Sequence, residues 1–418
     1  MADSPPFSSK LLLIIPQKSL ISLRGLNRLL CAGFFLSGIA TVLIGQILPV
    51  LAQRLRINDA SAGYFFIAQF AGSILGTLAT TWFARRHKFL PATVFGLISI
   101  AAAVLFLNFD NYFLCLNGFF VIGIGVGVTL PAINLLTLEI NSHTAASALN
   151  VLNFYWGVGA ISSQPLIDVL ISGTSIFVPT VLLAVALAGM AAIFLFLPAD
   201  SEQKFRNSRK AIENANAKLA EELNQPQRIW TNPMAWAIAL FNFVHVGFES
   251  GMSGWLKTFA ARVEYENGGA LILASPILLY FVFFVAGRGA APVFLRFLTV
   301  NKLLLLNLLA TLIGTILILS AADAAVLSGG AAIAGFGTSS IFPTNLSRFS
   351  RIFGAAARTR ATPLFVCGTL GSAATTWAIG FASDYFKNLR SGMFMLLASV
   401  LILIALQILL AFRKKRAN

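Results

Sequence analysis

Long apolar runs constrain this chain more than any other feature of its sequence. A helix that crosses the hydrocarbon core of a bilayer needs about 20 mostly apolar residues. The sequence contains twelve such runs, at residues 28–52, 61–83, 89–107, 113–138, 146–170, 176–197, 234–260, 270–295, 302–321, 324–346, 361–383 and 391–412. With 57% hydrophobic and 11% charged residues, the chain is too apolar for an ordinary soluble domain. We therefore predict an all-α polytopic membrane protein with twelve transmembrane helices.

The basic residues are distributed unevenly between the loops that join these runs. With a cytoplasmic N-terminus, twenty-three of the 30 Lys and Arg residues fall on the cytoplasmic side, and only Lys257 and Arg288 fall within spans. This asymmetry follows the positive-inside rule, so we expect a multi-pass protein of the plasma membrane with both termini cytoplasmic. The same asymmetry explains the net charge of +15 without nucleic acid as a partner.

The longest polar segment divides the runs into two sets of six. It is charged and rich in helix formers, which is typical of a cytoplasmic linker. The predicted divisions are a cytoplasmic N-terminal segment (1–27), an N-terminal six-helix bundle (28–199), the linker (200–233), a C-terminal six-helix bundle (234–412) and a basic cytoplasmic tail (413–418).

The two halves carry an internal repeat. The stretches GIGVGVTLP (123–131) and GFGTSSIFP (335–343) share the pattern Gly-x-Gly-x5-Pro at the same place in each half. Glycine permits close packing of helices, and proline bends the helix beside it. Together with the span count, the repeat predicts two pseudo-symmetric six-helix bundles. Duplicated halves around a central site are the architecture of alternating-access transporters.

Several motifs give this architecture a family resemblance. They are Gly247-Phe248-Glu249-Ser250 followed by Gly254-Trp255-Leu256, Ala286-Gly287-Arg288, Ile341-Phe342-Pro343-Thr344, Gly380 to Asp384, and Gln164-Pro165-Leu166-Ile167-Asp168. On these residues the chain resembles the major facilitator superfamily and is most similar to its fucose permease-like sugar:proton symporters. The resemblance implies two six-helix bundles that rock around a central site and transport a sugar together with a proton.

The chain also departs from the pattern of that family. The stretch from Gly76 to Arg86 keeps the glycine and arginines of the superfamily's signature but lacks its aspartate, which leaves the usual charged gate there in doubt. Fucose permease uses acidic residues in spans 1 and 4, where this chain has Gly45 and Leu130. The proton relay of fucose permease therefore cannot be carried over to this chain, and the identity of the substrate stays open.

Two ionisable residues lie in the middle of the seventh run. Glu249 and His245 are four residues apart and share one face of a helix. Charged groups at the centre of a membrane are costly and usually functional. We predict that both bind substrate and that Glu249 is the candidate for proton coupling. The alternative is a structural network in which Glu249 is neutral or pairs with Arg288 or Lys257.

Amide and indole side chains suggest the rest of a binding site. Amides form paired hydrogen bonds with hydroxyl groups, and an indole face packs on the C–H groups of a sugar ring. The predicted substrate-binding residues are Gln46, Asn134, Asn153, Trp156, Gln164, His245, Glu249, Trp255, Asn345 and Trp377. For each amide alone, a hydrogen bond between helices is an equally good explanation.

Charged residues near the span ends are candidates for gates. Glu139 and Arg351 occupy equivalent ends of spans 4 and 10, so they are candidates for a salt bridge at the inner gate. Asp168 and Asp384 end spans 5 and 11 on the outer side. There we expect them to meet the arginines that follow span 1, Arg54 and Arg56.

No group of residues in the sequence has the pattern of a catalytic or metal site. With three His, no metal-ligand spacing and no phosphate-binding loop, we expect neither an enzyme nor a cofactor. We predict a secondary active transporter that moves a small polar organic solute, a sugar in first place, by alternating access, with or without protons. Two alternatives stay open: a proton-driven exporter of amphipathic compounds, and a non-transporting receptor on the same scaffold. We expect a monomer whose partners are the solute and the lipid bilayer.

Overall fold

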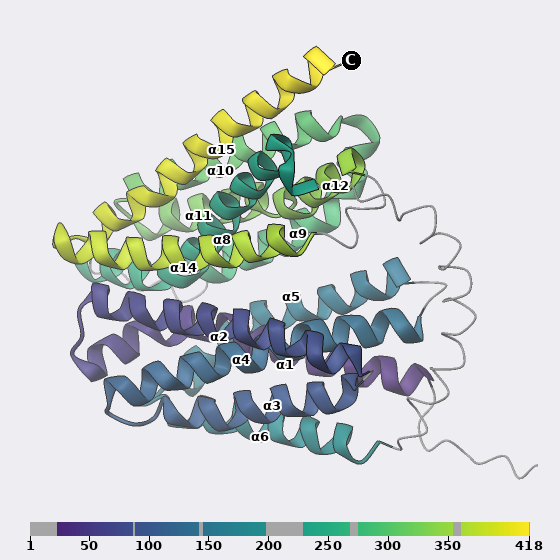
Figure 1. Cartoon of the computed structure of the whole chain (residues 1–418). Helices are drawn as coiled ribbons and strands as arrows, with labels where there is room; N and C mark the ends of the chain where they lie inside the picture. Colours follow the sequence, from purple (N-terminus) through teal and green to yellow (C-terminus); the bar gives the residue numbers. More distant parts are fainter. Residues whose placement is uncertain are drawn as a thin grey trace, which may run out of the picture.

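The computed structural model describes residues 23–86, 88–141, 145–197, 229–267, 275–353 and 361–417, which form two helical bundles (Figure 1). The N-terminal bundle consists of α1 (Leu23–Leu55), α2 (Asp59–Arg85), α3 (Phe89–Phe106), α4 (Tyr112–Ile140), α5 (Ala145–Leu170) and α6 (Phe177–Leu195). The C-terminal bundle consists of η1 (Ile229–Thr231), α8 (Pro233–Asn267), α9 (Pro276–Phe297), α10 (Val300–Ser320), α11 (Ala324–Thr338), α12 (Ile341–Phe353), α14 (Thr362–Tyr385) and α15 (Leu389–Ala417). Most of the predicted N-terminal segment and linker lies outside the described residues.

The predicted fold is confirmed. Helices α11 and α12 together form one apolar span, Ala324–Phe353, so each bundle contributes six spans. Within the described part of the chain, ten spans are long and apolar enough to cross a membrane by length and hydropathy alone. The other two, α5 and α8, carry Asp168, Glu249 and Lys257 within their length. Charged residues thus lie within the length of these two helices, as Arg288 does within α9.

The repeated glycines allow close contact between helix backbones in each bundle. A Cβ atom on Gly123 of α4 would overlap the backbone carbonyl of Gln69 on α2, and one on Gly335 of α11 would overlap that of Tyr280 on α9. Only glycine lets these backbones approach so closely. By the repeat, α4 corresponds to α11 and α2 corresponds to α9. The repeated glycines therefore lie at equivalent helix contacts in two pseudo-symmetric bundles.

The repeated prolines have different consequences in the two bundles. Proline has no N–H, so it leaves the carbonyl four residues earlier without its helical donor. In α4, Pro131 frees the carbonyl of Gly127, which accepts a hydrogen bond from the Thr80 hydroxyl at 3.2 Å, and the helix continues. In the C-terminal bundle the corresponding proline follows a break between α11 and α12. The single span predicted at 324–346 is therefore two helices in series.

Contacts between the bundles concentrate at one end of the molecule. Helix α2 packs on α14, α1 on α8 and α5 on α9. A Cβ atom on Gly45 of α1 would overlap the backbone carbonyl of Ser253 on α8. A Cβ atom on Gly380 of α14 would likewise overlap the backbone carbonyl of Asp59 on α2. All four residues lie toward the ends of their helices that are opposite to Leu23 and Ala417, and we call this the distal end.

Toward the other, proximal end the same helices pack on partners within their own bundle. Gly76 of α2 lies against Ile124 of α4, and Gly371 of α14 lies against Phe243 of α8. The bundles are therefore held together at the distal end, on the left in Figure 1.

Membrane orientation gives the first testable prediction. In a chain without its three native cysteines, we expect a cysteine in place of Lys387, in the distal loop between α14 and α15, to react with a membrane-impermeant maleimide in intact cells. A cysteine in place of Lys88, at the proximal end, should react only after permeabilisation. The reverse pattern of labelling would place the termini outside and contradict the predicted topology.

Candidate functional site

One face of α8 meets the N-terminal bundle. Glu249, Ser253 and Lys257 are spaced four residues apart and therefore share this face. Ser253 touches Gly45 of α1, and the Lys257 ammonium lies 2.7 Å from the Asp168 carboxylate on α5. Glu249 is thus one helical turn to the proximal side of the contact that closes the bundles.

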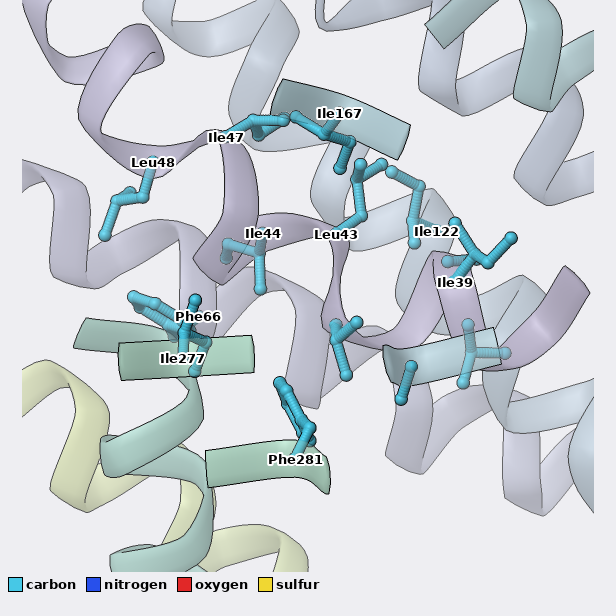
Figure 2. Close-up of a cluster of buried hydrophobic side chains, with 14 of the residues drawn as sticks. Ile39, Leu43, Ile44, Ile47, Leu48, Phe66, Ile122, Ile167, Ile277 and Phe281 are labelled. Atoms are coloured by element: carbon cyan, nitrogen blue, oxygen red, sulfur yellow. The ribbon is translucent and has the colours of Figure 1, made fainter. Parts of the chain in front are cut away.

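A matching face of α9 carries Arg288. Ile277 and Phe281 of α9 lie in one buried cluster with residues of α1 and α2 (Figure 2). One turn further, Val285 meets Gly157 of α5, where an added Cβ atom would lie 3.0 Å from a valine methyl group. Arg288 follows on the next turn, so it lies on the proximal side of the closed contact, as Glu249 does. The side chains of Arg288 and Glu249 are 33% and 23% exposed.

Glu249 lies between a guanidinium and an imidazole. Arg288 Nη2 is 3.7 Å from Glu249 Oε1, and His245 Nε2 is 3.6 Å from Glu249 Oε2. Both distances are longer than a hydrogen bond. The His245 ring is buried, and neither of its nitrogens has a hydrogen-bond partner among the described residues. The geometry brings the two predicted residues of α8 together and places Arg288, one of the two cations expected as an alternative partner of Glu249, within ion-pair distance of it.

Three predicted residues of the N-terminal bundle carry buried hydrogen-bonding groups that have no partner among the described residues. Gln46 of α1 is fully buried, and neither its amide oxygen nor its amide nitrogen has a partner in the described structure. On α5 the same holds for the indole N–H of Trp156 and for the amide oxygen of Gln164, whose nitrogen donates to Asp168. Each of the three adjoins a residue that contacts the C-terminal bundle: Gly45, Gly157 and Asp168.

The other predicted amides make structural contacts. Asn134 and Asn153 donate to carbonyls of their own helices, at 2.9 and 2.8 Å. Asn345 of α12 is buried and donates to the Ile238 carbonyl of α8 at 3.3 Å, which ties two helices of the C-terminal bundle together. The amide nitrogens of all three therefore have partners within their own bundles, and a role of these amides in substrate binding stays a prediction.

Of the three predicted indoles, Trp255 makes a structural hydrogen bond, whereas the buried indole N–H of Trp377, like that of Trp156, has no partner among the described residues. The Trp255 side chain is fully buried, donates to the Thr376 carbonyl at 2.9 Å and packs on Phe66 with 5.8 Å between ring centroids. Trp377 packs between α2 and α14, beside the exposed ring of Tyr64. Trp156 directly precedes Gly157, the residue of α5 that contacts Val285 of α9.

The predicted outer gate has different partners from those expected. Asp168 pairs with Lys257, and Asp384 accepts a hydrogen bond from Asn58 at 3.0 Å, so both join the two bundles. Arg54 instead pairs with Asp110 at 3.1 Å within the N-terminal bundle.

Of the remaining gate candidates, Arg54 and Arg56 have no partner in the other bundle among the described residues. Arg54 is held in its own bundle because its guanidinium also donates to the carbonyls of Leu107 and Phe109. Arg56 is exposed after the end of α1, and Arg351 is exposed on α12. The side chain of Glu139 lies outside the described residues, so the predicted inner gate stays a prediction.

An ion pair that sequence reasoning missed joins the distal ends of the bundles. Arg262 of α8 holds Asp59 of α2 with two parallel hydrogen bonds of 2.8 and 2.6 Å, and Ser383 of α14 also donates to Asp59. Asp59 directly follows Asn58, whose side chain caps α2. Asp59 and Arg262 lie at the edges of apolar runs, where charged residues are common. The one sequence signal for a contact between them was that both lie at distal span ends, in opposite halves of the chain.

Two duplicated six-helix bundles that meet across a polar interface define an alternating-access membrane transporter. Residues 30–366 match the sequence profile of the Major Facilitator Superfamily, and the chain belongs to this superfamily of transporters. No curated protein sequence matches the chain.

Solved structures share this fold along nearly the whole chain. A bacterial homologue of the human lysosomal transporter Spinster, in an inward-facing and occupied conformation, is 13% identical, with a TM-score of 0.72 over 92% of this chain and 96% of that one. The nucleoside transporter NupG is 12% identical, with a TM-score of 0.71 over 92% and 98%. The E. coli fucose:proton symporter FucP is 21% identical, with a TM-score of 0.56 over 93% and 99%. At these identities the likeness shows the fold alone.

Proposed function

We propose that the protein is a secondary active transporter of a sugar, which it binds between the two bundles and moves by alternating access. The unused hydrogen-bonding groups of Gln46, Trp156 and Gln164 carry this proposal. Buried polar groups in proteins almost always have partners, so three such side chains on two helices that contact the other bundle require an explanation. A solute with several hydroxyl groups would supply donors and acceptors to all three side chains.

We further propose that protons drive transport and that Glu249 couples the two movements. Among the carboxyl side chains that the structure describes, Glu249 is the one that lies at the bundle interface on the proximal side of the closed contact. Two structures with the same fold are described as proton symporters, of fucose and of D-xylose, which supports this proposal by analogy. With cytoplasmic termini, closure at the distal end corresponds to an inward-facing state.

A substitution at Gln46 tests the binding site directly. We expect Gln46→Leu to weaken sugar binding at least tenfold, about 1.4 kcal/mol, because the amide's hydrogen bonds to the solute are lost. The same variant should be at least as stable as the parent without ligand, because an unpaired buried amide is costly and leucine has a similar size. Thermal melting of the purified protein with and without each of a set of monosaccharides measures both effects.

The matched control is Asn117→Leu, which removes an exposed amide that bonds to its own helix at 2.9 Å. It should leave sugar binding unchanged. Uptake of the binding sugar into proteoliposomes then separates a transporter from a receptor, which would bind without moving its ligand. Stabilisation by lipophilic cations and by no sugar would favour the exporter and contradict the proposal.

A further inference from the structure

The charges at the bundle interface are distributed asymmetrically. On the N-terminal bundle, the side chains that we propose as solute ligands, Gln46, Trp156 and Gln164, are neutral. The C-terminal bundle presents one carboxylate, Glu249, and one guanidinium, Arg288. The site thus carries one fixed positive charge and one group that can be neutralised by a proton.

The other ionisable groups on the neighbouring helices are neutral, paired or remote. His245 and Tyr280 are buried beside Glu249. On α8 and α5, Lys257 and Asp168 neutralise each other. The described charges of α1 and α14 lie near the helix ends, at Arg24, Arg28, Arg54 and Asp384. Arg348 of α12 lies in a separate buried cluster, where it donates to Gln407 of α15.

Arg288 is fixed in place, yet its two terminal nitrogens are free. Its Nε donates to the Ser339 carbonyl at 3.1 Å, and Pro343 frees that carbonyl because it lacks the N–H that would bond there. The guanidinium also lies 4.2 Å from the centroid of the Phe284 ring. Within the described structure, neither Nη1 nor Nη2 has a hydrogen-bond acceptor, since Glu249 lies 3.7 Å away.

The distal ion pair differs from the pair of Arg288 and Glu249 in its hydrogen bonds. Arg262 holds Asp59 at 2.6 and 2.8 Å in the paired geometry that arginine and carboxylate adopt when they bond directly. Arg288 and Glu249 balance each other's charge without these bonds. The planar pair of donors on Arg288 is therefore available to a carboxylate from elsewhere.

Resting on the proposed proton coupling, we propose that the transported solute is a sugar acid whose single carboxylate binds Arg288 while Glu249 carries a proton. The empty site has one positive and one negative charge. When Glu249 takes up a proton from the water outside, the solute's carboxylate replaces it as the counter-ion of Arg288. Both the proton and the solute leave on the inner side, and the empty, neutral site returns.

This charge balance also explains how coupling is enforced. A site that holds the proton alone carries a net charge of +1, and one that holds the solute alone carries −1. An unpaired charge enclosed in the middle of a membrane is costly, so neither form should pass through the closed state. A neutral sugar with a proton would leave Arg288 unpaired, whereas the acid with a proton leaves the site neutral.

Matched pairs of sugars test the inference on the parent protein. We expect D-glucuronate and D-galacturonate to raise the melting temperature and to enter proteoliposomes, and D-glucose and D-galactose to do neither. Electrophysiology on supported proteoliposomes should show uptake of the acid without net charge movement, because one anion and one proton move together. Symport of a neutral sugar with a proton would instead move one positive charge in each cycle.

Two substitutions at Arg288 sharpen the test. Arg288→Gln removes the positive charge of the site. With Glu249 protonated, the variant site is then neutral when it holds a neutral sugar. The binding preference should therefore reverse from the sugar acid to the matched neutral sugar. Arg288→Lys keeps the charge but loses the paired donors, so the acid should remain preferred with about tenfold weaker binding. The control is Arg86→Gln, at an exposed arginine that packs on Trp82, and it should keep the parent preference.

The outcomes separate this inference from the proposed function. Binding and transport of the neutral sugars by the parent protein, with a positive inward current, would overturn the sugar acid and leave sugar transport standing. Failure of every member of both pairs to bind would contradict both. Preference for the acid that survives Arg288→Gln would place the carboxylate elsewhere and overturn the role of Arg288.

Discussion

Replacing Glu249 with glutamine is expected to abolish the accumulation of solute that a pH gradient drives, while exchange of solute between the two sides of the membrane continues. Glutamine keeps the shape of the side chain, but it cannot gain or lose a proton. Net accumulation requires the site to return empty and unprotonated, which the variant cannot imitate. Exchange needs only the loaded form, which the neutral amide resembles.

Proteoliposomes with an imposed pH gradient measure the first effect, and counterflow of labelled solute measures the second. Asp323→Asn serves as a control, because it neutralises a carboxylate that caps α11 and asparagine caps helices equally well. Uphill accumulation by the Glu249 variant with the parent's pH profile would exclude Glu249 as the coupling residue. Loss of both binding and exchange would make it a solute ligand or a structural residue instead.

The transmembrane architecture was predictable because the bilayer leaves few alternatives. Backbone groups in hydrocarbon must bond within their own segment, so each apolar run of sufficient length becomes a helix. The glycine and proline repeat predicted equivalent halves for a similar reason, since close packing at Gly123 and Gly335 depends on the absence of a side chain. These features are local in the sequence and need no knowledge of tertiary contacts.

Pairings between the bundles were not predictable in the same way. Hydropathy places a charged residue along a span, but its partner depends on the rotation and tilt of two helices from different halves. Asp168 therefore has Lys257 as its partner and not Arg54, which the carbonyls of Leu107 and Phe109 hold. The break after Thr338 also escaped prediction, because the equivalent Pro131 leaves α4 continuous.

The hydrogen-bond partners of the tryptophan side chains were not predictable from the sequence either. Periodicity identifies Trp255 as a residue on an interior face, but it does not show which group accepts the indole N–H. Here the acceptor is the Thr376 carbonyl of α14, which makes the ring a structural contact. By contrast, Trp156 and Gln46 have the same kind of sequence surroundings and keep unused donors.

Removing the charge of Asp59 is expected to shift the protein toward a state that is open at the distal end. The Asp59–Arg262 pair joins α2 to α8, and charge-assisted hydrogen bonds of this kind contribute about 1.5–3 kcal/mol. Arg262 is 45% exposed, so water recovers part of that energy when its partner is lost. A net effect of about 1 kcal/mol would change the ratio of the two states roughly fivefold for Asp59→Asn.

Distances between spin labels at Phe109 and Lys387, in distal loops of opposite bundles, would report this shift as a new, longer population. The matched control is Asp110→Asn, because its ion pair with Arg54 lies within the N-terminal bundle and does not change when the bundles separate. Exchanging the two charges, with Asp59→Arg and Arg262→Asp in one chain, should restore the closed population that either change alone removes. If Asp59→Asn gives the same distances as the control, the closed distal end is held by the packing of α2 on α14 and by the Lys257–Asp168 pair, and the Asp59–Arg262 pair is not what selects this state.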